Sequence, residues 1–121
     1  MKDYAQTLHS FWSAFGLPAY DENTVPDRTA FPYITYNVTA AAFNETVTMS
    51  ASLWYRSTSW KEITDKAEQI RETLEDGGRY IVTNKGALWI KTGVPFAQRM
   101  SDVDDSVRRI YINIEVDYIE Y

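Results

Sequence analysis

Hydrophobic and polar side chains alternate along the end of the chain, from Arg108 to Tyr121. Successive side chains of an extended strand point to opposite faces, so residues at every second position share a face. The apolar positions of this segment are Ile110, Ile112, Ile114 and Val116. The segment therefore predicts a long strand with one buried face.

The same alternation recurs earlier in the chain. Residues 32–38 and 46–56 predict two successive strands that form a hairpin with its tip at residues 40–45. Three further short strands are predicted at residues 79–83, 87–91 and 96–100. Such alternation is typical of antiparallel sheets with one solvated face.

Two segments have helical spacing instead. Residues 4–15 place apolar side chains on one helical face, and Gly16 ends the helix. A second helix follows Ser59 and ends at Gly77 and Gly78. Its apolar stripe comprises Ile63, Ala67, Ile70 and Leu74.

The predicted order is one helix, two strands, one helix and then four strands. Helices that are segregated from consecutive antiparallel strands are typical of α+β proteins. We therefore expect an antiparallel or mixed sheet packed against two helices. A chain of 121 residues fits a single domain that spans residues 1–121.

The charge balance narrows the classes of partner. The chain has 12 basic and 17 acidic side chains, which give a formal net charge of −5. Because counterion release by basic side chains supplies most non-specific affinity for nucleic acids, this balance disfavours DNA binding through a basic groove. No segment approaches the ~18 apolar residues of a membrane-spanning helix, and the start MKDYAQTLHSFW lacks the features of a signal peptide.

Residues that usually carry catalysis are scarce. Cysteine is absent and His9 is the single histidine, so thiolate metal sites are excluded and a zinc site lacks ligands. His9 has no recognisable nucleophile as a partner, which favours a structural role. Asp102, Asp104 and Asp105 read as a turn, with a weak divalent-cation site as the alternative, because a calcium loop needs a glycine and a later glutamate. We expect no enzyme activity, no cofactor and no metal.

Trp54 is unusual among the aromatic residues. Most of them alternate along strands, where cross-strand packing explains them. Trp54 instead lies on the hydroxyl-rich face of the strand at residues 46–56, with Ser50 and Ser52. This position predicts a surface anchor in a protein–protein contact.

The succession of segments resembles one known family. An aromatic helix ends in FGLPAY and is followed by the strand FPYITYNV and by TVTMSASLWYRSTSW, a long strand that leads into the second helix. The chain closes with VPFAQRMSDVDDSVRRIYINIEVDYI. This pattern, which covers nearly the whole chain, resembles the tail-terminator (tail-completion) proteins of long-tailed bacteriophages and prophages.

The resemblance implies a structural protein without catalytic activity. It would form a ring, usually a hexamer, on the head-proximal end of the tail tube, where it would stop tube polymerisation and provide the head-joining interface. Its partners would be further copies of itself, the tail tube protein and head–tail connector proteins, with no membrane involved. DNA would pass through the lumen without specific binding. The protein would occupy the host cytoplasm during assembly and then the virion tail.

Interface residues are expected at the hairpin tip, in the connection at residues 17–31, on the strand at residues 46–56 and on the terminal strand. The candidates are Phe43, Asn44, Glu45, Tyr20, Asp21, Glu22, Trp54, Tyr111 and Tyr118. If the terminal strand forms an edge of the sheet, acidic residues would guard it against unspecific pairing. These residues are Glu115, Asp117 and Glu120.

Two alternatives from other classes remain open. One is another head–neck or tail-completion component with a similar small fold. The other is a monomeric domain that binds a small molecule between sheet and helices, or an enzyme without a recognisable motif. Fold alone does not separate these functions.

Overall fold

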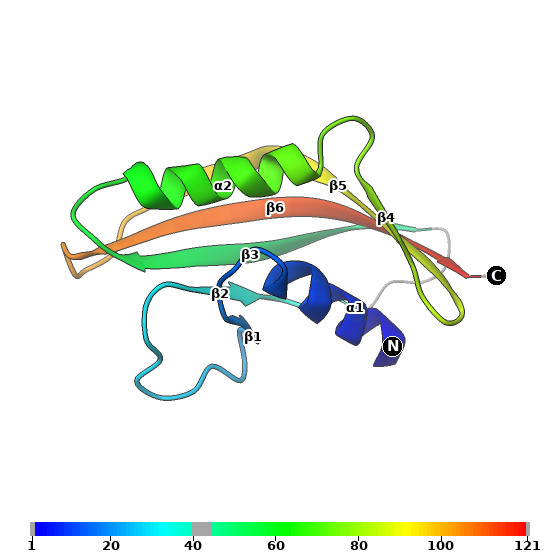
Figure 1. Ribbon diagram of the computed structural model, residues 1–121, viewed down its shortest axis with the longest axis horizontal. Helices are drawn as coiled ribbons and strands as arrows, with labels where there is room; N and C mark the ends of the chain where they lie inside the picture. Colours follow the sequence, from blue (N-terminus) through cyan, green and yellow to red (C-terminus); the bar gives the residue numbers. More distant parts are fainter. Residues whose placement is uncertain (1, 40–44, 121) are drawn as a thin grey trace.

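The computed structural model describes residues 2–39 and 45–120 (Figure 1). Within them the chain forms two helices and six strands, which confirms the α+β class. The elements are α1 (Lys2–Ser13), β1 (Ala19–Asp21), β2 (Tyr33–Tyr36), β3 (Thr46–Arg56), α2 (Lys61–Thr73), β4 (Arg79–Val82), β5 (Gly86–Met100) and β6 (Val107–Glu120).

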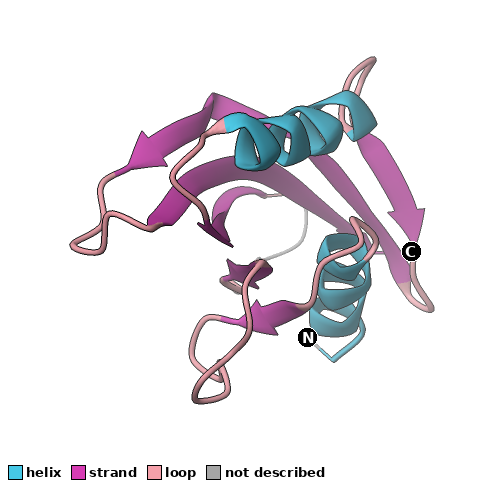
Figure 2. Cartoon of the chain, turned by 60° about the vertical axis from the view of Figure 1, so that its left-hand side comes forward, coloured by secondary structure: helices cyan, strands magenta, loops and turns pink. Residues whose placement is uncertain are grey.

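The described strands form one mixed sheet in the order β1-β2-β3-β6-β5-β4. Only β1 and β2 pair in parallel within this sheet, and every other neighbouring pair is antiparallel. The longest uninterrupted ladder joins β3 to β6 and runs from Thr46 opposite Asp117 to Arg56 opposite Val107. Figure 2 shows the curvature of these long strands.

Both helices pack on the same face of the sheet. The core residues follow the predicted stripes: Tyr4, Leu8, Phe11 and Trp12 from α1, with Phe15 just after it, and Ile63, Ala67 and Ile70 from α2, with Leu74 just after it. Alternate strand residues complete this core, including Ile34, Met49, Leu53, Leu88, Ile90, Ile110, Ile112 and Ile114. A fully buried aliphatic or aromatic side chain stabilises the fold by about 1.5–3 kcal/mol relative to an exposed one. The alternation in the sequence therefore correctly predicts which face of each long strand is buried.

Glycines end both helices, as the sequence predicts. Gly16 has φ +81° and turns the chain immediately after Phe15, which stays buried although α1 ends at Ser13. Gly77 and Gly78 have φ +96° and +87° and follow the end of α2. L-amino acids with a side chain rarely adopt these φ values.

The predicted element order is wrong in two places. The connection at residues 17–31 contains β1, a strand of three residues that pairs in parallel with β2. The strands predicted at residues 87–91 and 96–100 are one strand, β5. A register shift between Thr92 and Ala97 absorbs the residues between them as an irregularity of the ladder. The observed order of elements is therefore one helix, three strands, one helix and three strands.

The expectation that the terminal strand forms an exposed edge is also wrong. β6 lies between β3 and β5 and is hydrogen-bonded on both sides. Glu115 lies opposite Thr48 on one neighbour and Lys91 on the other, so it does not guard an edge. The order of strands in a sheet depends on pairings between distant segments, which alternation within one strand does not encode.

Candidate interaction surface

The face of the sheet opposite the helices carries a connected row of aromatic and arginine side chains. We call Phe31, Tyr33, Trp54, Arg109 and Tyr111 the arginine–aromatic row. The rings of Tyr33 and Trp54 are stacked, with centroids 6.1 Å apart and an interplanar angle of 14°. The ring of Phe31 meets Tyr33 edge-on at 5.2 Å. In the part of the chain that the structure describes, both helices pack on the opposite face, so no helix covers this row, and each of its side chains is half-buried.

The pairing of β2, β3 and β6 brings the residues of the row side by side. Tyr33 lies opposite Trp54 in the β2–β3 ladder, and Trp54 lies opposite Arg109 in the β3–β6 ladder. The indole Nε1 of Trp54 donates a hydrogen bond of 2.9 Å to the hydroxyl of Thr35, which fixes the ring. The row therefore crosses three adjacent strands, with each side chain held by a neighbour.

Arg109 is held in place by two different contacts. Its Cζ lies 4.6 Å from the ring centroid of Trp54 and 5.9 Å from that of Tyr111. Its Nε donates a hydrogen bond of 3.1 Å to the hydroxyl of Ser52, which is 3% exposed. A guanidinium over an aromatic face contributes about 0.5–1 kcal/mol at an exposed site. The side chain is thereby ordered before any partner arrives.

Three of the predicted interface residues meet on this surface. Trp54 and Tyr111 belong to the row, and the ring of Tyr20 meets Tyr33 at 6.2 Å. Asp21 ends β1 and accepts a hydrogen bond of 2.9 Å from the backbone N–H of Asn23, which makes it part of a turn. Tyr20, Trp54 and Tyr111 therefore share one face of the sheet.

The other candidates lie elsewhere. The backbone N–H of Glu22 donates to the carbonyl of Tyr36, and Glu45 is exposed immediately before β3. Tyr118 lies on the helix-covered face, where its ring meets Tyr4 edge-on at 5.3 Å. Its packing role within the chain is therefore clear. The candidates Phe43 and Asn44 fall outside the described residues.

The sequence interpretation does not include Tyr33, Phe31 and Arg109 among the site residues. Of these three residues, Arg109 could have been found from the sequence. It lies two positions before Tyr111 and so shares a strand face with this predicted interface residue. Its contact with Trp54 depends on the register of β3 with β6, across a long separation in sequence.

An ion pair lies on the same uncovered face, towards the other end of the sheet. Lys91 Nζ lies 3.0 Å from a carboxylate oxygen of Asp117, and the hydroxyl of Thr46 bonds the other oxygen. Partial burial raises the pKa of Asp117, but the hydrogen bonds from Thr46 and Lys91 and the charge of Lys91 together lower it further, so the net shift is downward. Lys91 lies on β5, Asp117 on β6 and Thr46 on β3, so these contacts join three adjacent strands.

We expect Asp117→Asn to lower the free energy of unfolding by about 1 kcal/mol at pH 7. Because the folded-state pKa is depressed, this contribution is present above the unfolded pKa of about 4 and is lost as the pH falls through the folded pKa. The difference in urea unfolding between wild type and variant should therefore be smaller at pH 3 than at pH 7. Asp105→Asn, at an exposed turn position, is the matched control. An equal loss of unfolding free energy at both pH values would contradict a stabilising role for the charged form of Asp117.

The groups considered for catalysis have structural contacts. His9 Nδ1 lies 2.9 Å from the hydroxyl of Tyr36, and its Nε2 lies 3.4 Å from the hydroxyl of Ser13. Asp102 and Asp104 accept hydrogen bonds from backbone N–H groups two residues ahead, as a turn requires. Among the described residues, no group of three or more histidine, cysteine or carboxylate side chains is arranged to hold a metal.

A cleft of about 530 Å³ opens between α1, α2 and β4. Phe11 and Phe15 form part of its apolar lining, and Gln69, Thr73 and Thr83 form part of its polar lining. Figure 1 shows β4 passing near both helices. The cleft lies on the opposite face from the arginine–aromatic row, so the two surfaces are separate.

The fold is similar to that of a protein in a solved virion structure. The match is to a chain of the virion of a native gene transfer agent (GTA) particle, with a TM-score of 0.66 and 15% sequence identity. The chain shares that fold. The similarity covers 99% of this chain and 93% of the other, so nearly every element described above has a counterpart. No protein-family model matches the sequence, and no curated protein does.

The described helices α1 and α2 have 12 and 13 residues. Neither is long and apolar enough to cross a membrane.

Proposed function

We propose that this chain is a structural protein of a phage-type virion, which forms a ring, with six copies, on the head-proximal end of the tail tube. The observation that carries this proposal is the match over 99% of the chain to a protein of a gene transfer agent virion. The match spans nearly the whole chain and is not confined to one motif. The order of segments along the sequence, which resembles that of tail-terminator proteins, supports a position at the head-proximal end of the tail.

The ring would act through contacts, without making or breaking a bond. One side would cover the last layer of tube protein, which ends polymerisation, and the other would offer a surface to the head connector. The arginine–aromatic row supports such a role, because tryptophan, tyrosine and arginine dominate the binding energy of protein interfaces. The uncovered row thus has the composition of an interface.

The charge of the chain suits a ring around a DNA channel. A net charge of −5 disfavours adhesion to phosphates, and acidic groups towards the lumen would repel passing DNA. DNA would then move through the ring without specific binding.

Deletion of the gene from its phage or prophage should give particles with overlong tails that do not join heads. The reason is that an uncapped tube end continues to accept tube protein. Negative-stain microscopy of lysates measures tail length and head attachment, and expression of the wild-type chain from a plasmid is the control. Tails of normal length that remain unjoined would assign the chain to another neck component. Normal virions would refute both assignments.

The cleft between α1, α2 and β4 supports one different function, a small-molecule-binding domain. Its volume of about 530 Å³ lies within the usual range of ligand sites, about 300–1,000 Å³. A monomeric binder would gain thermal stability from a metabolite and would leave tail assembly unchanged. A ring protein would instead show no gain in thermal stability from a metabolite, and its loss would change tail assembly.

A further inference from the structure

Arg109 presents an ordered cation with unused hydrogen-bond donors. Its Nε bonds Ser52 and its guanidinium plane rests on Trp54, while its terminal amino groups have no acceptor among the described residues. The carboxylate whose charge reaches Tyr33 of the row is that of Asp102, and it accepts a hydrogen bond from the backbone N–H of Asp104. A planar guanidinium with both terminal amino groups available favours a carboxylate, which accepts two parallel hydrogen bonds from it.

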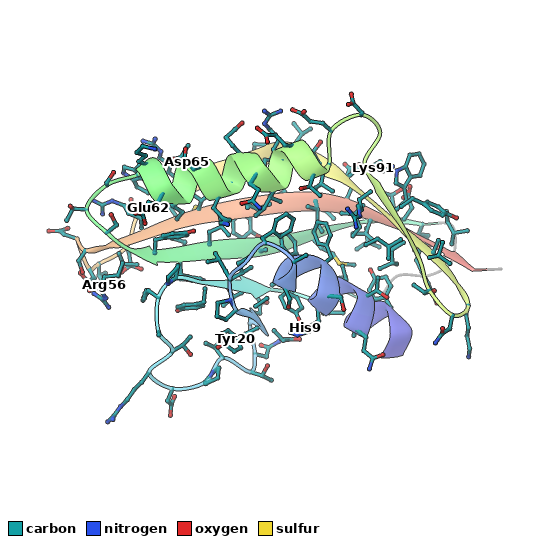
Figure 3. The ribbon with its side chains drawn as sticks, in the orientation of Figure 1. His9, Tyr20, Arg56, Glu62, Asp65 and Lys91 are labelled. Carbon is teal, nitrogen blue, oxygen red and sulfur yellow. The ribbon has the colours of Figure 1, made fainter. Side chains whose placement is uncertain are left out.

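The outer side of α2 supplies carboxylates in a complementary arrangement. Residues 61–76 contain six acidic and three basic side chains. Because a helix turns about 100° per residue, the positions directly opposite the buried stripe of Ile63, Ala67, Ile70 and Leu74 are Asp65 and Glu72, and both are exposed. Figure 3 shows Asp65 near the start of α2.

The basic residues of α2 neutralise only part of this side. Lys61 pairs with Asp65, Arg71 pairs with Glu68 and Glu75, and Lys66 reaches back to the carbonyl of Phe15. Within the described residues, Glu72 has no ion pair, and it lies at the centre of the acidic side.

The two surfaces point in opposite directions. The arginine–aromatic row lies on the uncovered face of the sheet, and the acidic side of α2 lies beyond the helix layer on the other face. One copy therefore cannot satisfy its own Arg109 with its own α2. A contact between these surfaces must join two copies head to tail, and such heterologous contacts generate rings or filaments.

We propose that the arginine–aromatic row of one copy binds the acidic outer side of α2 of a second copy, with Arg109 clamping the carboxylate of Glu72. The inference rests on the proposed ring function and names the contact that builds the ring. Copies that each carry a net charge of −5 repel one another in most orientations. This orientation joins an ordered cation to an acidic surface, so electrostatics selects it.

A charge exchange in the full chain tests the contact. Arg109→Glu and Glu72→Arg should each weaken self-association by about 10-fold or more, since each places like charges together. The double variant restores opposite charges and should recover most of the lost affinity. Lys85→Glu changes the net charge equally at an exposed position in the turn between β4 and β5, and should associate as wild type does. Sedimentation velocity over a range of protein concentrations at low salt measures the association, and thermal melting confirms that each variant is folded.

Each outcome separates the contact from the proposed function. The proposed contact is wrong if wild type stays monomeric, if Arg109→Glu associates normally, or if the double variant does not recover affinity. The gene deletion tests the proposed function independently of these results. Loss of binding to a single-stranded oligonucleotide in Arg109→Glu, with self-association intact, would make the row a nucleic-acid surface and overturn the proposal. Arg109→Lys keeps the charge but lacks the planar fork, so it should weaken association less than Arg109→Glu.

Discussion

Replacement of Trp12 by alanine should lower the free energy of unfolding by about 3–5 kcal/mol. Trp12 is 1% exposed and is among the largest fully buried side chains of the described residues. Its ring meets Phe11 at 4.9 Å and Phe15 at 6.4 Å, so its removal leaves a cavity beside these two aromatic rings. Since small proteins have a total stability of about 5–15 kcal/mol, the loss would be a large fraction of it.

Urea unfolding followed by circular dichroism measures this loss, with Trp89→Ala as the matched control. Trp89 is 37% exposed, and its main polar contact is a hydrogen bond to the carbonyl of Gly77. Its replacement should cost about 1–2 kcal/mol. If the two variants lost equal stability, α1 would not be docked on the sheet as described.

Gly78→Ala should destabilise the chain more than Gly77→Ala, although both positions have positive φ. The backbone strain of a side chain at such φ values costs about 1–2 kcal/mol and applies to both variants. A Cβ at Gly77 would meet nothing within 4 Å. At Gly78 it would lie 2.4 Å from the carbonyl oxygen of Ile90 and 3.0 Å from Trp89 Nε1. That clash involves backbone and should add about 1–3 kcal/mol.

Comparison of the two glycine variants isolates the close approach of residue 78 to β5. Both variants carry the same backbone strain, so the strain cancels in the comparison. The difference between their denaturation midpoints measures how closely the turn after α2 approaches β5. Equal midpoints would mean that the turn moves away from β5 without cost.

Local patterns predict the parts of the fold that depend on local chemistry. The buried stripes of both helices follow from helical spacing, and the faces of β3 and β6 follow from alternation, because burial needs only the period of the element. Gly16 ends the first helix for a similarly local reason. These features were accessible from the sequence.

Features that depend on a distant partner were not accessible. β1 has three residues and exists because β2 lies beside it. Gly93, within a predicted break, continues β5, because the absence of a side chain lets its backbone approach Asn113 of β6, where a Cβ would lie 2.9 Å away. The arginine–aromatic row has the same origin: Trp54 was evident from its own strand, whereas Arg109 needed the register of β3 with β6.

The central position of β6 has a consequence for biosynthesis. Thr46 of β3 finds its partner Asp117 only 71 residues later. While the ribosome is still translating the residues between them, β3 and β5 lack the strand that lies between them in the sheet. Topologies dominated by such distant pairings fold in milliseconds to seconds and expose unpaired strands meanwhile. The sheet of this chain can therefore close only after β6, the last strand to be synthesised, has emerged from the ribosome.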